Sequence, residues 1–355
     1  MTNFQREESR LAIVGNAGAT NVGESLRRAA LSLGFEVLFF DCYDAWPGNR
    51  ILRSVAWRFN DNRPLRIEDF TDNVLVTCGK ARPEILIATG TAPLTAVALE
   101  TLRRLGIVSV NYSTDDPWNP AQTANWFLRT LRSYDLILTT RRANIRDFQR
   151  TGCGEVQYLP FGYDDELFGE AGGSMQGGGH DVLFVGGADK ERVAFISEFM
   201  SAGPAVALVG AYWTSARQTR RFALGHRTPD EVRILTTAAK VNLCLVRRAN
   251  RDGHVMRSFE IAALGGCMLA EDTAEHREIF GPDGEAVVYF STPHEAAERA
   301  RSLLADPAER ARLSAAVRSR ISRGAHTYRD RLVSILEAAT RIRRAQSEPG
   351  ESPVR

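Results

Sequence analysis

Short apolar runs alternate with longer amphipathic segments along this chain, and the whole alternation occurs twice. In the first half, the apolar runs predict buried strands at 11–15, 36–41, 84–90, 108–113 and 136–140. Residues 25–34 and 93–106 have the pattern of helices that end at a glycine. Parallel strands need a crossover connection, which is usually a helix, so this half predicts a parallel α/β sheet.

The second alternation begins after a glycine-rich segment, GEAGGSMQGGGH, at residues 169–180. Such a composition is typical of a linker or a loose loop. The strands predicted beyond it are 182–187, 205–210, 240–246, 267–270 and 286–290. The length of 355 residues also exceeds the commonest size of a single domain. We therefore expect two doubly wound α/β domains that face each other across a cleft at the carboxyl ends of their strands, where ligands bind by default.

The expected domains are residues 1–168 and 181–325, joined by residues 169–180. A further helix is expected at 326–345. The polar tail at 346–355 has the composition of a disordered segment.

Composition excludes several classes of protein. The net charge of +2 gives no reason to expect the dominant basic face of a nucleic-acid binder. The five cysteines contain no close pair, so neither a CxxC zinc site nor a disulfide framework is expected. The polar N-terminus does not have the pattern of a signal peptide, and no apolar stretch approaches the length of a membrane span. We expect a cytoplasmic protein with no membrane span.

The first candidate site is GNAGATNVGES, which follows the first predicted strand. The loop that contains Gly15, Asn16 and Gly18, with the helix start after it, could hold an anion. However, its glycines do not fit G-x-G-x-x-G, and no Walker lysine follows them. A tight turn between strand and helix is the alternative.

The second candidate site is YSTDDPWNP, which also follows a strand. Asp115 or Asp116 could act as a general base or bind a substrate hydroxyl, and the ring of Trp118 beside them suits a sugar. The alternative is a loop whose aspartates cap the next helix.

The third candidate site is RRANRDGHVMRSFE at residues 247–260, where a strand leads through a loop into a helix. Four arginines are expected to gather there: Arg247, Arg248, Arg251 and Arg257. Guanidinium groups and a helix N-terminus both favour a diphosphate, and Glu260 in the first turn could accept hydrogen bonds from ribose hydroxyls. Alternatively, Ser258 is an ordinary N-cap, Glu260 only complements the helix dipole, and the arginines are solvated.

The fourth candidate is FVGGADKERV, in which the Gly186–Gly187 pair would let a ligand approach closely and Lys190 and Arg192 could reach a phosphate. A plain glycine turn is the alternative. The histidines show no metal-binding spacing, and neither G-x-S-x-G nor D-x-D occurs, so no metal site and no hydrolase elbow are expected.

These residues resemble a known family. From RSFEIAALGGCMLAED to HTYRDRLVSIL, and over about residues 180–337 in all, the chain resembles GT-B glycosyltransferases of the spore-maturation type in the glycosyl transferases group 1 family. STDDPWN resembles the N-terminal half more loosely. The resemblance implies two Rossmann-like domains with a C-terminal helix that crosses back to the first.

The resemblance also implies roles. The donor would be a nucleoside-diphosphate sugar, bound as substrate with neither metal nor cofactor. Glu260 would bind its ribose and Arg257 and Ser258 its diphosphate, while Asp252, eight residues before Glu260, would lie near the transferred sugar. The Gly186–Gly187 turn resembles the donor-side glycine loop of the family, and Asp115 or Asp116 would be the base. From the candidate sites themselves, Arg192, His254 and Phe259 are added to the donor side, and Gly15, Asn16, Gly18 and Trp118 are expected to form an acceptor or phosphate loop.

The acceptor, whether a glycan, a protein or a small molecule, stays open at this stage, as do the nucleotide base and the stereochemistry. A sugar-nucleotide epimerase, a phosphorylase and a non-catalytic nucleotide-sugar-binding module are the alternatives on the same architecture.

Overall fold

The computed structural model describes residues 10–18, 20–46, 48, 60–169 and 179–347. They form two compact units. Unit 1 contains the chain up to Pro160, the short segment Ala249–Arg251 and the chain from Tyr328 onward. Unit 2 contains Phe161–Arg248 and Asp252–Thr327. The division therefore falls at Pro160, eight residues before the expected boundary at 168, and the glycine-rich residues 170–178 lie outside the described residues.

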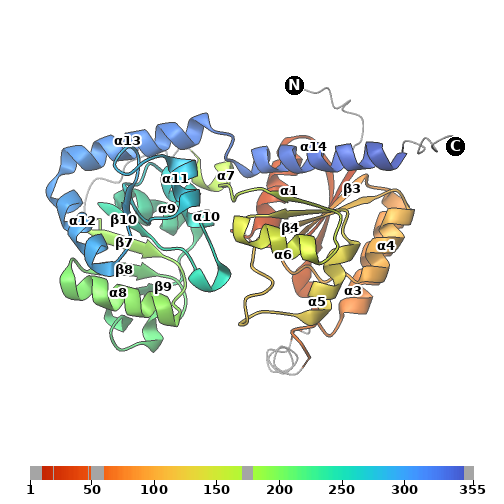
Figure 1. Cartoon of the computed structure of the whole chain (residues 1–355), viewed down its shortest axis with the longest axis horizontal. Coiled ribbons are helices and arrows are strands. Elements are labelled where there is room, and N and C mark those ends of the chain that lie inside the picture. The colour runs from red at the N-terminus through yellow and green to blue at the C-terminus, as the bar shows by residue number, and fades with distance from the viewer. Residues whose placement is uncertain (1–9, 19, 47, 49–59, 170–178, 348–355) are drawn as a thin grey trace. The chain divides into compact units, whose positions relative to one another are not determined.

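Unit 1 is built on a six-stranded parallel sheet with strand order β2-β1-β3-β4-β5-β6, covered by helices (Figure 1). Its strands are β1 (Arg10–Gly15), β2 (Glu36–Asp41), β3 (Ile85–Thr89), β4 (Val108–Ser113), β5 (Leu136–Thr139) and β6 (Glu155–Tyr158). Its α-helices are α1 (Val22–Ser32), α3 (Ile67–Ala81), α4 (Ala96–Arg104), α5 (Asn125–Thr130), α6 (Ile145–Arg150) and α14 (Tyr328–Ser347). Its described residues also contain the short 3₁₀ helices η1 (Cys42–Ala45), η2 (Leu131–Ser133) and η3 (Arg142–Asn144).

Unit 2 has a second six-stranded parallel sheet, in the order β12-β11-β10-β7-β8-β9. Its strands are β7 (Val182–Val185), β8 (Val206–Val209), β9 (Ala223–Gly225), β10 (Val241–Cys244), β11 (Met268–Glu271) and β12 (Val288–Phe290). Its α-helices are α7 (Asp165–Phe168), α8 (Lys190–Ala202), α9 (Pro229–Ala238), α10 (Met256–Ala263), α11 (Ala274–Phe280), α12 (Pro293–Ala305) and α13 (Pro307–Arg323). Its 3₁₀ helices are η4 (Trp213–Ser215), η5 (Arg220–Phe222) and η6 (Arg248–Asn250), the last of which ends in the segment assigned to unit 1.

The prediction of two doubly wound parallel α/β domains is confirmed, and each has its own core. The core of unit 1 includes Val14, Leu86 and Phe127, and that of unit 2 includes Phe184, Phe199 and Leu269. Each sheet has a central strand that is buried from end to end, β4 in one and β10 in the other, because helices cover both faces of a parallel sheet.

Two strands were not predicted, and both are at sheet edges. β6 is four residues long with no buried residue, and β9 has three residues, all half-buried. An edge strand needs no continuous apolar run, so it leaves little hydrophobic pattern in the sequence.

Helix α14 belongs to unit 1 although it is at the end of the chain, and it packs against α1 and β4 (Figure 1). Tyr328, Leu332, Ile335 and Ala339 recur at helical spacing and are all buried. The 326–345 segment is thus a helix at 328–347. No helix in the described part of the chain is long and apolar enough to cross a membrane.

Candidate functional site

The start of α10 brings together a buried acid and an arginine. The chain leaves β10 at Cys244 and enters α10 at Met256, so this helix begins after the carboxyl end of a central strand. Glu260 is the fifth residue of α10 and so lies in its second turn, not in the first turn as predicted. It is 2% exposed and forms an ion pair with Arg257. Within the described residues, neither Glu260 Oε2 nor Arg257 Nη1 has a hydrogen-bond partner of good geometry. A buried carboxylate paired with a half-buried guanidinium group near a helix start is a candidate site for a polar ligand.

Burial raises the pKa of Glu260, and the neighbouring Arg257 opposes that shift. A carboxylate has several lone pairs, so Glu260 can accept hydrogen bonds from a pair of hydroxyl groups.

Ser258 lies in the first turn of α10, but its hydroxyl is fully used inside the protein. Its Oγ is 2.9 Å from His276 Nε2 and accepts a hydrogen bond from the Val255 N–H at 3.3 Å. His276 Nδ1 lies 2.8 Å from the Glu271 carbonyl oxygen, which can only accept, so this nitrogen carries the proton and Nε2 accepts from Ser258. Burial lowers the pKa of His276 to about 4, so the ring is neutral. The N-cap of α10 is Val255, so Ser258 is not the N-cap that the alternative proposed. Its hydroxyl instead stabilises the helix start through the Val255 N–H and His276.

His254 is also enclosed, with 1% of its surface exposed. Its Nδ1 lies 2.6 Å from Glu275 Oε2, and its Nε2 accepts a hydrogen bond from the Phe161 N–H at 3.1 Å. Its ring also meets the edge of the Phe259 ring. Phe259 is completely buried. Both side chains are buried in the protein, so His254 and Phe259 stabilise the start of α10 through packing and hydrogen bonds.

The glycine pair after β7 is packed against its neighbours. The Gly186 carbonyl accepts a hydrogen bond from Trp213 Nε1 at 2.7 Å, and a Cβ on Gly210 would lie 2.4 Å from that carbonyl oxygen. Gly187 has no side chain in the way of a ligand, since a Cβ there would meet only the Ala211 oxygen at 3.9 Å.

Arg192 connects the loop after β7 with the residue that follows β10. Its guanidinium group donates to the carbonyl oxygens of Gly187 at 3.1 Å and Leu245 at 3.3 Å. Burial lowers its pKa, and the nearby Arg247 lowers it further. Arg192 also lines a small pocket with Leu245 and Glu271.

The four arginines of residues 247–257 do not form one cluster. Arg248 makes two hydrogen bonds to Glu271, the shorter at 2.6 Å. Arg247 lies 3.8 Å from Asp189, and its backbone N–H donates to Asp252 at 3.3 Å. Arg251 belongs to unit 1. Arg257 is therefore the arginine of this set that lies within α10, beside Glu260.

Asp116 is the buried partner of Arg251. Its carboxylate accepts hydrogen bonds from Arg251 at 2.6 and 3.0 Å, from Asn144 at 2.7 Å and from the Trp118 N–H at 3.0 Å. Burial alone would raise the pKa of Asp116, but these hydrogen bonds outweigh it and hold the pKa below its ordinary value. A carboxylate held in this way is a weak base, so the geometry favours a structural role for Asp116.

Asp115 has different surroundings from Asp116, as expected for consecutive side chains on an extended segment. It is half-buried, and its Oδ2 lies 3.9 Å from the Cβ position of Gly90, just after β3. Within the described residues its carboxylate has no hydrogen bond or ion pair. Trp118 packs at the core, with its ring centroid 4.9 Å from that of Phe148 in an edge-to-face arrangement.

The loop after β1 has a packing explanation. A Cβ on Gly15 would lie 2.8 Å from the Gly23 Cα and 2.7 Å from Thr89 Oγ1, so glycines at both positions let α1 approach β1. Gly18 has φ +116, a conformation that favours glycine. Asn16 is exposed. In the described segments, no group of three or more metal-ligating side chains is assembled.

The sequence reasoning missed His276, Glu275 and Glu271, which hold the α10 start from the β11–α11 segment. Their sequence, EDTAEH, follows the strand ending at Glu271, so it occupies the same sheet edge as the loop after β10. Position after a neighbouring parallel strand was the indication that could have found them.

The class of protein follows from the fold and from the family match. Residues 191–337 match a family model described as glycosyl transferase-like. The two parallel sheets with this topology have the fold of GT-B glycosyltransferases, and the described chain aligns with solved members over nearly its whole length. The fold is therefore that of GT-B glycosyltransferases, and residues 191–337 are similar to a glycosyl transferase-like family, as the sequence resemblance predicted.

Among solved structures, the chain is similar to sucrose-phosphate synthase from Thermosynechococcus elongatus, with 14% identity, a TM-score of 0.69, and coverage of 96% of this chain and 100% of that one. It is similar to α,α-trehalose 6-phosphate synthase from Burkholderia multivorans, with 11% identity, a TM-score of 0.64, and coverage of 96% and 100%. It is also similar to Anabaena Alr3699/HepE in complex with UDP and glucose, with 12% identity, a TM-score of 0.64, and coverage of 93% and 100%. No curated protein sequence matches the chain significantly.

Proposed function

We propose that the protein transfers a sugar from a nucleoside-diphosphate sugar to an acceptor hydroxyl without a bound metal ion, and that the donor binds at the start of α10. The observation that carries the proposal is the ion pair between the buried Glu260 and the half-buried Arg257 in the first two turns of α10. Glu260 would bind the ribose hydroxyls, and Arg257 would bind the diphosphate.

Charge at the helix start supports this assignment. The α10 N-terminus carries partial positive charge and free backbone N–H groups, both of which favour a diphosphate. As the bond from the anomeric carbon to the diphosphate oxygen breaks, negative charge develops on the leaving group, and Arg257 would stabilise it as a metal ion does elsewhere. Gly187 would leave room for the donor, and Asp252 would face the transferred sugar.

The acceptor oxygen would attack the anomeric carbon while its proton passes to a base, and the nucleoside diphosphate would leave. Of the two candidate bases, Asp115 is the better one, because the lone pairs of Asp116 are occupied by Arg251 and Asn144. The Anabaena neighbour was solved with UDP and glucose, which makes a UDP-sugar the first donor to test.

The test is thermal stabilisation by UDP, GDP, dTDP and ADP. At about 100 times its dissociation constant, the right nucleotide adds about 2.7 kcal/mol to the free energy of unfolding. The variants are Glu260→Gln and, as a matched control, Glu298→Gln, which changes an exposed carboxylate on α12 of the same unit.

We expect one nucleotide to stabilise the wild type and the control but not Glu260→Gln. Equal stabilisation of all three proteins would reject the α10 site. Nucleotide binding without sugar transfer to any acceptor would instead favour a non-catalytic binding module, and turnover of the donor without an acceptor would favour an epimerase.

A further inference from the structure

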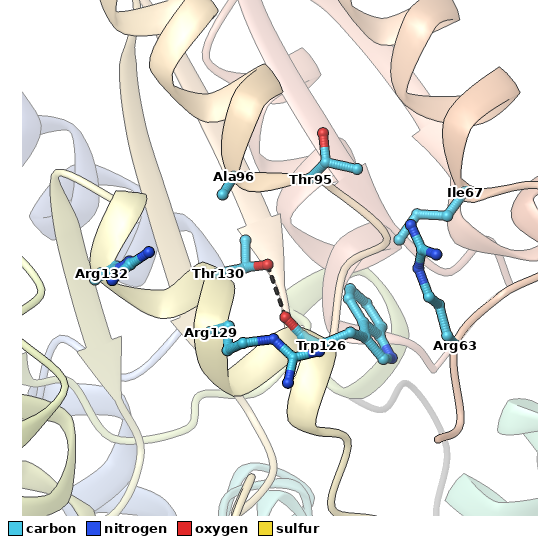
Figure 2. A pocket seen from close by; sticks show the side chains of 8 residues that line it. All are labelled: Arg63, Ile67, Thr95, Ala96, Trp126, Arg129, Thr130 and Arg132. Atoms are coloured by element: carbon cyan, nitrogen blue, oxygen red, sulfur yellow. Dashed lines mark hydrogen bonds between the residues drawn. The ribbon is translucent and has the colours of Figure 1, made fainter. Parts of the chain in front are cut away.

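Tyr212, in the loop after β8, is the most exposed large hydrophobic residue in the described part of the chain. Its exposed fraction is 74%. By contrast, Trp126, which lines a pocket of unit 1 (Figure 2), is only 8% exposed. The side chain of Tyr212 has no hydrogen bond, ion pair or ring contact with any described residue. Packing within unit 2 therefore does not account for an aromatic ring at this position.

The backbone of Tyr212 is in the left-handed region, with φ +67° and ψ 0°. A bulky residue rarely adopts this conformation, because its Cβ crowds the backbone. The neighbouring residues hold the loop in place: the Ala211 carbonyl accepts a hydrogen bond from the Ala188 N–H at 2.9 Å. The buried Trp213 donates from Nε1 to the Gly186 carbonyl at 2.7 Å. A glycine would adopt this conformation with less strain, and strain that the surroundings enforce is typical of functional positions.

The same hydrogen bonds place Tyr212 beside the glycine turn of the proposed donor site. In the sheet, β7 lies between β8 and β10, and α10 follows β10. The loops after these parallel strands share one edge of the sheet, which is where ligands bind in such folds. Gly187 follows the middle strand and has no side chain, so none projects there between the start of α10 and the loop that carries Tyr212.

We infer that the ring of Tyr212 stacks on the base of the nucleoside-diphosphate donor, an inference that rests on the proposed function. With the ribose at Glu260 and the diphosphate at Arg257, the base is the part of the nucleotide that the α10 start does not bind. A flat aromatic ring matches the flat face that every nucleobase has. Stacking does not recognise the edge of the base, so Tyr212 contributes affinity and does not select among bases.

The experiment uses the full-length protein and measures its affinity for UDP, GDP, dTDP and ADP by calorimetry. Tyr212→Phe keeps an aromatic ring, Tyr212→Leu keeps only an apolar side chain, and Tyr212→Gly removes the side chain while suiting the left-handed backbone. Tyr43→Ala is one control, because it removes a tyrosine that is 53% exposed in unit 1. Arg82→Gly is the other, because it places glycine at a left-handed residue, φ +53°, just after α3.

We expect Tyr212→Leu and Tyr212→Gly to bind the nucleotide that the wild type prefers at least about fivefold more weakly, since loss of an aromatic ring that stacks on a base costs at least roughly that factor. Tyr212→Phe and both controls should bind it like the wild type. Saturation-transfer NMR of the same nucleotide should show that Tyr212→Leu weakens the signals of the base protons relative to those of the ribose protons.

Unchanged affinity in Tyr212→Gly overturns the inference, as does equal affinity of Tyr212→Leu and Tyr212→Phe. An unchanged ratio of base to ribose signals in Tyr212→Leu would also overturn it, because the ring would then not contact the base. Glu260→Gln separates this inference from the proposed function. Nucleotide binding that needs Tyr212 but not Glu260 would keep the stacking and reject the α10 site, and binding that needs Glu260 but not Tyr212 would do the reverse. If no nucleotide binds the wild type, both are wrong.

Discussion

At the scale of single residues, the α10 start separates groups that bind a ligand from groups that hold the site. Ser258 donates to His276 and accepts from the Val255 N–H, so it has a complete set of partners. We predict that Ser258→Ala leaves nucleotide binding nearly unchanged but lowers the free energy of unfolding by about 1–3 kcal/mol, because His276 Nε2 is left buried without a donor.

Urea unfolding and UDP titration of the same samples check this prediction. Ser201→Ala, an exposed serine on α8, is the matched control and should change neither quantity. A large loss of UDP affinity in Ser258→Ala at unchanged stability would restore Ser258 as a diphosphate ligand.

Glu260 makes the stability of the protein depend on pH. Burial raises its pKa in the folded state, so its folded-state pKa exceeds its unfolded one. The stability that the protonated form of Glu260 contributes is fully present below the pKa of the unfolded state, about 4.3. It is lost as the pH rises through the pKa of Glu260 in the folded state. We predict that Glu260→Gln melts at a higher temperature than the wild type at pH 8 and that this advantage shrinks toward pH 4.

Melting curves across that pH range, without nucleotide, test the sign. Glu298→Gln should show no such trend, because Glu298 is exposed. An advantage of Glu260→Gln that grows toward acid pH would mean that the ionised form, paired with Arg257, is the stable one.

At the scale of elements, the contact between β1 and α1 depends on two glycines. A Cβ on Gly23 would lie 2.9 Å from the Gly15 Cα, a backbone atom that cannot move aside without shifting the strand or the helix. We predict that Gly23→Ala costs about 1–3 kcal/mol through overpacking. Gly79→Ala, within α3 and with nothing within 4 Å of its Cβ position, should instead stabilise the protein by about 0.5–1 kcal/mol.

Denaturant unfolding of the two variants compares one chemical change at two helical sites. Equal effects of the same sign would show that helix propensity, and not the β1–α1 contact, sets the cost at Gly23.

The elements also show what the sequence can predict. Buried interior strands leave continuous apolar runs, which is why VSVNYS coincides with β4 and LAIVG with all but the first residue of β1. Helix starts were less accurate: α4 begins at Ala96, after Thr95 has capped it, and not at Pro93. Whether the helix begins at the proline or after the threonine depends on the hydrogen bond that the Thr95 side chain accepts, and the pattern of apolar residues does not reveal that bond.

In the candidate site, the sequence placed Glu260 and Arg257 on one helix because their spacing alone puts them on neighbouring turns. The sequence could not predict which arginine pairs with Asp116 and which with Glu271, since these two acids lie in other segments of the chain. Ion pairs of this kind depend on tertiary contacts, which single-sequence patterns do not encode.

At the scale of the whole molecule, the two units have separate cores, and the last helix of the chain completes the first of them. Leu332 is fully buried on α14, which packs against α1 and β4. We predict that Leu332→Ala lowers the stability of unit 1 by about 2–5 kcal/mol, whereas Val333→Ala, at a position 39% exposed, changes it little.

Because unit 2 is a separate core and the proposed donor site lies within it, a nucleotide should protect unit 2 alone. Scanning calorimetry of the full chain can test this. We predict two transitions: Leu332→Ala lowers the one that belongs to unit 1, and UDP raises the other in both the wild type and the variant. If UDP raised the transition that Leu332→Ala lowers, the donor would bind to unit 1. A single transition that responds to both changes would mean that the two cores unfold as one cooperative system.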